Sequence, residues 1–181
     1  LINQHESAAV LMVHAAEFQQ INKKFGHEQG DIVIWEISQN LLDCVRETDL
    51  VSRFGGALFA IAIPVENEQS AIMMAEKVQT LLQQPDYLDG ALSLGFDVGV
   101  ATVKQDESFS SDMERVTSQI SRADQALKAS QSAVNPTITV WHPGQMDIYN
   151  LQQDYIGGIF TADTGTDYRN MLLLWDISNI I

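Results

Sequence analysis

Short apolar runs alternate along the chain with amphipathic stretches, and the two periods predict a mixture of strands and helices. Residues 7–15 are mostly apolar, as expected of a buried strand. Apolar residues recur at intervals of three and four over 17–26, 31–46, 66–84 and 111–130. This spacing places apolar side chains on one face of a helix, so we predict four helices there.

The remaining apolar segments predict further strands. Residues 46–64 have the pattern of a hairpin that turns at Gly55-Gly56, and 91–103 and 137–141 are each typical of one strand. The predicted order is β-α-α-β-β-α-β-α-β, which mixes hairpin with crossover connections. We therefore expect an α+β fold (an α/β sandwich), with a central mixed, mostly antiparallel sheet flanked by helices.

The character of the sequence changes after residue 144. We predict one domain over 1–144 and a C-terminal extension, or the start of a following element, over 145–181. The end of this extension, 167–181, has the pattern of a helix. The chain begins at Leu1 instead of Met, which favours a piece of a longer protein.

Charge and composition exclude several classes of function. The net charge is −14, from 24 acidic against 10 basic residues, and this field repels nucleic-acid backbones. No apolar run approaches the roughly 18 residues of a membrane span, so direct membrane insertion is not expected. The single cysteine, Cys44, excludes an internal disulfide. We expect a cytoplasmic location, within a larger and even membrane-anchored protein.

Three segments give the chain a specific resemblance. "FQQINKKFGHEQGD", "VRETDLVSRFGGALFAIAIP" and "ADQALKAS" resemble, in order and spacing, the GGDEF domain of diguanylate cyclases, and the likeness covers about 7–141. It implies a palm-like βααββαβ core, here with most of the N-terminal helical lead missing. Members of that family condense two GTP molecules into cyclic di-GMP, a bacterial second messenger.

The resemblance also shows where this sequence departs from the family. The signature hairpin of the family reads Gly-Gly-(Asp/Glu)-Glu-Phe, and here Ala57 and Leu58 replace its two acids. The first acid binds metal together with an aspartate at the end of the first strand, where this chain has His14. Magnesium prefers carboxylate oxygens, and a leucine cannot accept a proton. We therefore expect no magnesium cofactor and no metal site.

The basic residues that hold the triphosphate in the family are replaced as well. The matching positions on and just after the last helix are Gln131 and Asn135, and a basic position after the first strand is Gln19. Phosphoryl transfer needs positioned cations to offset charge in the transition state. We therefore predict a degenerate GGDEF domain that is not an enzyme and has no catalytic residues.

Two positions of the substrate half are retained. Asn22 and Asp31 occupy the positions that bind the guanine edge in the family. A carboxylate can accept hydrogen bonds from guanine N1–H and the 2-amino group. An alternative is structural, because Asp31 would lie in the first turn of a predicted helix, where the helix dipole favours an acid. A GTP sensor that does not turn over its ligand is therefore a further alternative, and it would use these two residues.

The segment Arg46-Glu47-Thr48-Asp49 matches the Arg-x-x-Asp pattern of the family's inhibitory site, which binds cyclic di-GMP. An arginine offers a planar fork for guanine or phosphate oxygens, and an aspartate accepts from the guanine edge. Counting from the hairpin, Lys77 of the next helix supplies the further basic residue. The alternative is that Arg46 and Asp49 pair with each other on a solvated helix end.

These residues lead to one main hypothesis and one alternative of a different class. The first is a catalytically inactive receptor in which cyclic di-GMP bridges this domain to another domain or to a homodimer mate. The alternative is a structural, dimerisation or protein-interaction module without a nucleotide ligand. Asp97 places one further acid near the emptied site, but one carboxylate without partners does not hold magnesium.

Overall fold

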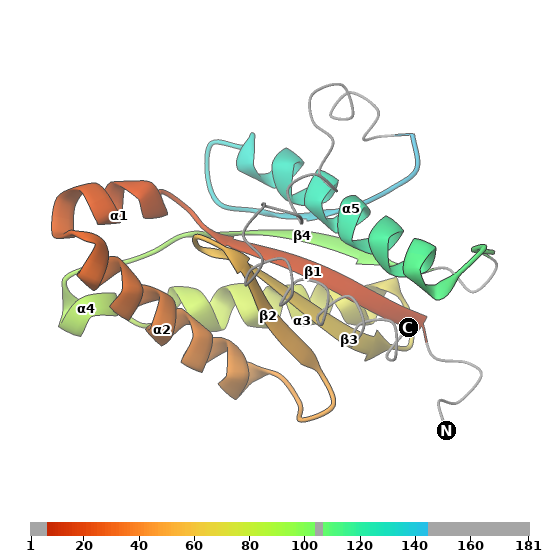
Figure 1. Cartoon of the computed structure of the whole chain (residues 1–181), viewed down its shortest axis with the longest axis horizontal. Helices are drawn as coiled ribbons and strands as arrows, with labels where there is room; N and C mark the ends of the chain where they lie inside the picture. Colours follow the sequence, from red (N-terminus) through yellow and green to blue (C-terminus); the bar gives the residue numbers. More distant parts are fainter. Residues whose placement is uncertain (1–6, 104–106, 145–181) are drawn as a thin grey trace.

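The computed structural model describes residues 7–103 and 107–144, which form a five-stranded sheet with helices on both faces (Figure 1). The strand order is β2-β3-β1-β4-β5. The strands are β1 (Ser7–Ala15), β2 (Leu50–Gly55), β3 (Leu58–Val65), β4 (Phe96–Thr102) and β5 (Ile138–Val140). The β4–β5 pair is parallel and the others are antiparallel, so the predicted fold class is confirmed.

Helices cover the two faces unequally. The helices are α1 (Phe18–Phe25), α2 (His27–Cys44), α3 (Glu68–Gln83), the short α4 (Tyr87–Gly90) and α5 (Asp112–Gln131). Figure 1 shows α5 on one side of the sheet, with α2 and α3 on the other. The predicted order of long elements is therefore confirmed, and α4 is an addition.

The central strand β1 is buried on both faces. Leu11 and Val13 pack into the apolar cluster shared with α1, α2 and α3, whereas Val10 and Met12 pack into the cluster beneath α5. A strand that is covered on both sides has no polar face. This is why residues 7–15 read as a continuous apolar run.

Gly99 sets how closely α5 approaches the sheet. A Cβ atom at this position would lie 2.1 Å from the carbonyl oxygen of Ala123 and 2.3 Å from the amide nitrogen of Leu127. Both neighbours are backbone atoms of α5, so no side-chain rotation could make room. Gly99 is therefore a position where the strand interior needs a glycine to allow close backbone approach.

The expected helix over 31–46 has different limits in the structure. It begins at His27 and ends at Cys44, so the residues before Asp31 are already helical. Gly30 is an interior residue of α2, where a Cβ would meet the side-chain oxygen of Asn22 at 1.9 Å. The glycine therefore serves close packing of α1 on α2, and does not mark a helix start.

The strand expected over 91–103 is also shorter, at Phe96–Thr102. Residues 91–95 follow α4 as a loop, and both Leu88 and Asp89 adopt left-handed backbone angles that no sequence signal indicated. Among the described residues no helix is long and apolar enough to cross a membrane. The expected extension over 145–181, with its helix, lies outside the described residues.

Candidate ligand sites

The end of β1 brings the hairpin tip and β4 together. His14 is the Cα partner of Leu58 on β3 and of Asp97 on β4, so these residues flank it on the two sides. Ala57 is buried, and its carbonyl oxygen accepts a hydrogen bond from the amide of Ala15 at 3.1 Å. The positions that the family uses for metal binding and catalysis are thus gathered here, with apolar or neutral side chains on them.

These positions line a cavity of about 550 Å³ at the hairpin tip. His14, Ala57, Leu58 and Gln131 all line it. Within the described ranges no group of three or more His, Cys, Asp or Glu side chains could hold a metal ion. That magnesium does not bind remains a prediction.

Two lysines that the sequence analysis did not single out also line this cavity, Lys23 and Lys128. Lys128 Nζ lies 3.1 Å from a carboxylate oxygen of Asp124, one helical turn earlier on α5. Burial raises the pKa of Asp124, and the lysine partly offsets this shift. The positive charge of Lys128 is therefore engaged by a neighbouring acid, and helical spacing alone would have indicated this pair.

His14 is poorly suited to replace a metal-binding aspartate. Burial lowers the pKa of its imidazole, and the nearby carboxylate of Asp97 acts in the opposite direction. Its Nδ1 is buried without a hydrogen-bond partner. A ring held in this environment favours the neutral form, which adds no negative charge to attract a hard cation.

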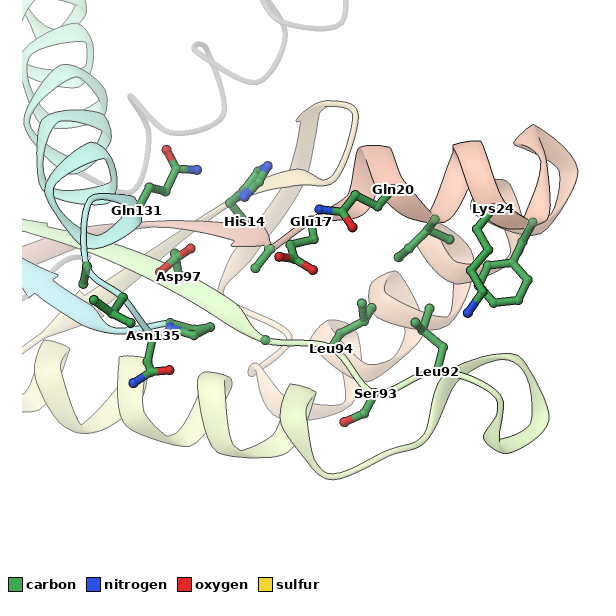
Figure 2. A pocket seen from close by; sticks show the side chains of 17 residues that line it. His14, Glu17, Gln20, Lys24, Leu92, Ser93, Leu94, Asp97, Gln131 and Asn135 are labelled. Atoms are coloured by element: carbon green, nitrogen blue, oxygen red, sulfur yellow. The ribbon is translucent and has the colours of Figure 1, made fainter.

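A second cavity, of about 750 Å³, adjoins the first on the β4 side of β1 (Figure 2). Gln131 and Asn135, both exposed, line it together with His14 and Asp97. Asp97 is only 6% exposed, and its Oδ1 lies 3.1 Å from Ser130 Oγ. The same oxygen accepts a hydrogen bond from the Thr137 amide at 3.2 Å, which ties β4 to the segment entering β5.

The two retained guanine positions lie at the junction of α1 and α2. Asn22 is half-buried, and its side-chain oxygen has no hydrogen-bond partner, whereas Asp31 is exposed. Asp31 is the fifth residue of α2, beyond its first turn, so the predicted dipole explanation for this acid is wrong. Neither residue lines either of the two cavities described above.

The Arg-x-x-Asp segment is a turn, not a helix end. The amide of Asp49 donates to the carbonyl of Arg46 at 3.0 Å, and the amide of Arg46 donates to Asp49 Oδ2 at 2.8 Å. Arg46 is exposed, and in the described part of the chain no ion pair joins its guanidinium to Asp49. The alternative of a helical Arg–Asp pair is therefore wrong.

Lys77 reaches the same region from α3. Its Nζ donates to the carbonyl of Cys44, the last residue of α2, at 2.7 Å. Counting along the sequence thus placed Lys77 near the Arg46 turn correctly, although its ammonium already has an acceptor. Arg53 does not join this group, because its Nε donates to the carbonyl of Gly56 at 2.8 Å and holds the hairpin tip.

The sheet, its helices and the hairpin that turns at Gly55-Gly56 define an α+β domain of the palm-like class. The sequence profile described as "Diguanylate cyclase, GGDEF domain" matches residues 2–135, and the chain belongs to the GGDEF family. The GGDEF domain of TpbB (YfiN) from Pseudomonas aeruginosa has a similar fold, with a TM-score of 0.67 and 26% identity. That match covers 76% of this chain and 83% of the solved one.

Curated relatives agree with this family assignment. The chain is 28% identical over 137 residues to diguanylate cyclase A of Treponema denticola, covering 75% of this chain and 35% of the relative. It is 30% identical over 138 residues to diguanylate cyclase DosC of Escherichia coli, covering 74% and 28% respectively. The chain thus spans about a third or less of the length of these relatives.

Proposed function

We propose that this chain is a catalytically silent GGDEF domain that binds cyclic di-GMP at Arg46, Asp49 and Lys77. The observation that carries the proposal is that Arg46 is exposed within the turn closed by Asp49, while Lys77 is hydrogen-bonded to Cys44, two residues before that turn. At the hairpin tip, by contrast, the acidic positions of the family carry Ala57 and Leu58. On this proposal, ligand recognition is retained at the Arg46–Asp49 turn, although the catalytic groups at the hairpin tip are replaced.

The turn suits a guanine ligand chemically. Asp49 Oδ2 is used by the Arg46 amide, which leaves Oδ1 to accept from the N1–H and amino groups of guanine. The Arg46 fork can donate two parallel hydrogen bonds to guanine N7 and O6 or to a phosphate. Lys77 would exchange its bond to the Cys44 carbonyl for a phosphate oxygen, a charge-assisted and therefore stronger partner.

Replacing Arg46 should abolish most of this binding. We expect Arg46→Ala to weaken the affinity for cyclic di-GMP about 30-fold or more, since a charge-assisted bidentate contact contributes about 2 kcal/mol. Isothermal titration calorimetry of the full chain measures this change. Arg53→Ala is the matched control, because it removes an exposed arginine that holds the hairpin and not the turn.

Two results would reject the receptor proposal. One is the absence of heat when cyclic di-GMP is added to the unmodified protein. The other is equal affinity of the protein and its Arg46→Ala variant, which would place any binding elsewhere.

A second candidate function is protein interaction through α2. Three large apolar side chains of this helix are exposed: Ile32 by 43%, Trp35 by 63% and Leu42 by 55%. Their spacing of three and seven residues places them along one face of the helix. The helix also carries four acids, Glu28, Asp31, Glu36 and Asp43, and no lysine or arginine. This combination fits an amphipathic partner helix whose apolar strip is bordered by basic residues.

Trp35 is the expected anchor of such an interface, because buried tryptophans dominate the binding energy of interfaces. We expect Trp35→Ser to weaken binding of a synthetic leucine–lysine amphipathic helix about tenfold or more, as measured by fluorescence anisotropy of the labelled peptide. Val134→Ser is the control, since Val134 is 99% exposed but lies after α5. Equal weakening by both variants would show that the peptide is held by charge alone.

A further inference from the structure

The cavity of about 750 Å³ on the β4 side of β1 shares His14, Glu17, Gln20 and Gln131 with the cavity at the hairpin tip, and its other walls are separate. They come from the β1–α1 junction, from residues 92–95 before β4 and from residues 133–136 after α5. Hairpin residues 55–58 line only the adjoining cavity at the hairpin tip. The volume falls within the roughly 300–1,000 Å³ of sites that enclose small organic ligands.

Two carboxylates line this cavity, with Asp97 toward one end and Glu17 nearer the middle. Asp97 is 94% buried, given its 6% exposure, and both of its hydrogen bonds use Oδ1. Within the described residues no donor is bonded to its Oδ2. Glu17 is exposed and precedes α1 with left-handed backbone angles, φ 58° and ψ 16°, and its side chain caps no helix amide. Such strain in a non-glycine residue is typical of functional sites.

The other end carries a cation. Lys24 Nζ lies 4.8 Å from the centre of the Phe25 ring, and in the part of the chain that the structure describes it forms no ion pair. Figure 2 shows Asp97 toward one end of the cavity and Lys24 toward the other, with Glu17 and Gln20 between them. The wall along this length includes the apolar side chains of Ile21, Leu92 and Leu94.

We propose that this cavity binds an α-amino acid with a cationic side chain, of the arginine class. The guanidinium would meet the carboxylates of Asp97 and Glu17, the methylene groups would lie along the apolar wall, and the α-carboxylate would meet Lys24. A phosphate ligand is disfavoured because it would face the carboxylates of Asp97 and Glu17. Binding here does not depend on cyclic di-GMP binding at Arg46.

Ligand analogues test each end separately. L-Arginine is expected to bind in isothermal titration calorimetry and to raise the melting temperature of the full chain, since a ligand that binds only the folded state stabilises it. L-Citrulline keeps the shape but lacks the positive charge, and agmatine lacks the α-carboxylate. Both are expected to bind about tenfold more weakly than L-arginine, the effect of losing one charge-assisted contact. Ionic strength is matched with NaCl throughout.

Two variants locate the contacts. Lys24→Gln is expected to weaken the binding of L-arginine about tenfold and to leave the binding of agmatine unchanged, because agmatine has no carboxylate for Lys24. Glu17→Gln is expected to weaken the binding of both ligands. Glu17 is exposed, so this variant should fold, whereas Asp97 also holds the Thr137 amide and is left intact. Glu76→Gln on α3 is the control that removes an equal charge at an exposed site remote from the cavity lining.

Three results would overturn the proposal. The first is an unchanged melting temperature and no heat with L-arginine at millimolar concentration. The second is equal binding of L-citrulline and L-arginine. The third is an equal effect of Glu17→Gln and Glu76→Gln, which would reduce any binding to the general attraction of a cation to a protein of net charge −14.

Discussion

Incubated with GTP and magnesium, the protein is expected to form no cyclic di-GMP above the rate of a mixture without protein. Leu58 cannot accept the proton of an attacking hydroxyl, and the absence of a positioned base alone costs about 10²–10⁴-fold in rate. Ala57 and His14 provide no carboxylate for the metal, and Gln131 and Asn135 offer no charge to the phosphates. Each loss acts on the same transition state, so the combined effect exceeds that of any one of them.

Chromatography of the reaction products measures this turnover directly. Diguanylate cyclase A of Treponema denticola, assayed in parallel, is the comparison that shows the assay detects product. Cyclic di-GMP that accumulates in proportion to the concentration of this protein, and that disappears when magnesium is chelated, would contradict the prediction.

Gly99→Ala is expected to destabilise the fold by about 3 kcal/mol or more, or to prevent folding. The added methyl would lie 2.1 Å from the Ala123 carbonyl oxygen and 2.3 Å from the Leu127 nitrogen, so α5 would have to move away from β4. Overpacking of a buried site costs about 1–3 kcal/mol when side chains can adjust, and here the neighbours are backbone atoms. Losing the contact of α5 with Val10 and Met12 adds to this cost.

Urea denaturation followed by circular dichroism gives the change in the free energy of unfolding. Thr102→Ala, at a partly exposed position of the same strand, is the control and is expected to change stability far less. A Gly99→Ala variant as stable as the control would show that α5 does not pack against β4 at this distance.

Periodicity predicted the long elements because each one is encoded by neighbouring residues. The apolar run of β1 and the spacing of Ile34, Ile37 and Leu41 along α2 locate their elements without reference to the rest of the chain. The limits of α2 could not be found in this way. A glycine such as Gly30 usually indicates a break in a helix. Only its contact with the side chain of Asn22, from α1, gives it a packing role inside α2.

The same distinction between local sequence and tertiary contacts applies to the candidate sites. The hairpin tip could be predicted, since its groups follow one another in the sequence and the register of β1 and β3 brings His14 opposite Leu58. The Asp49 turn could not, because it depends on a carboxylate accepting from the backbone amide of Arg46. The larger cavity could not either, since its walls come from three segments far apart in the chain.

The sequence by itself determined the family, the order of the long elements and the chemistry available at the hairpin tip. These depend on residue types and local spacing, which folding does not alter. Only the tertiary structure decided that Asp97 meets Ser130 and that Glu17, Lys24 and Asp97 line one cavity. Such contacts join residues that are distant in the chain, and they depend on how helices and strands pack, which no local pattern records.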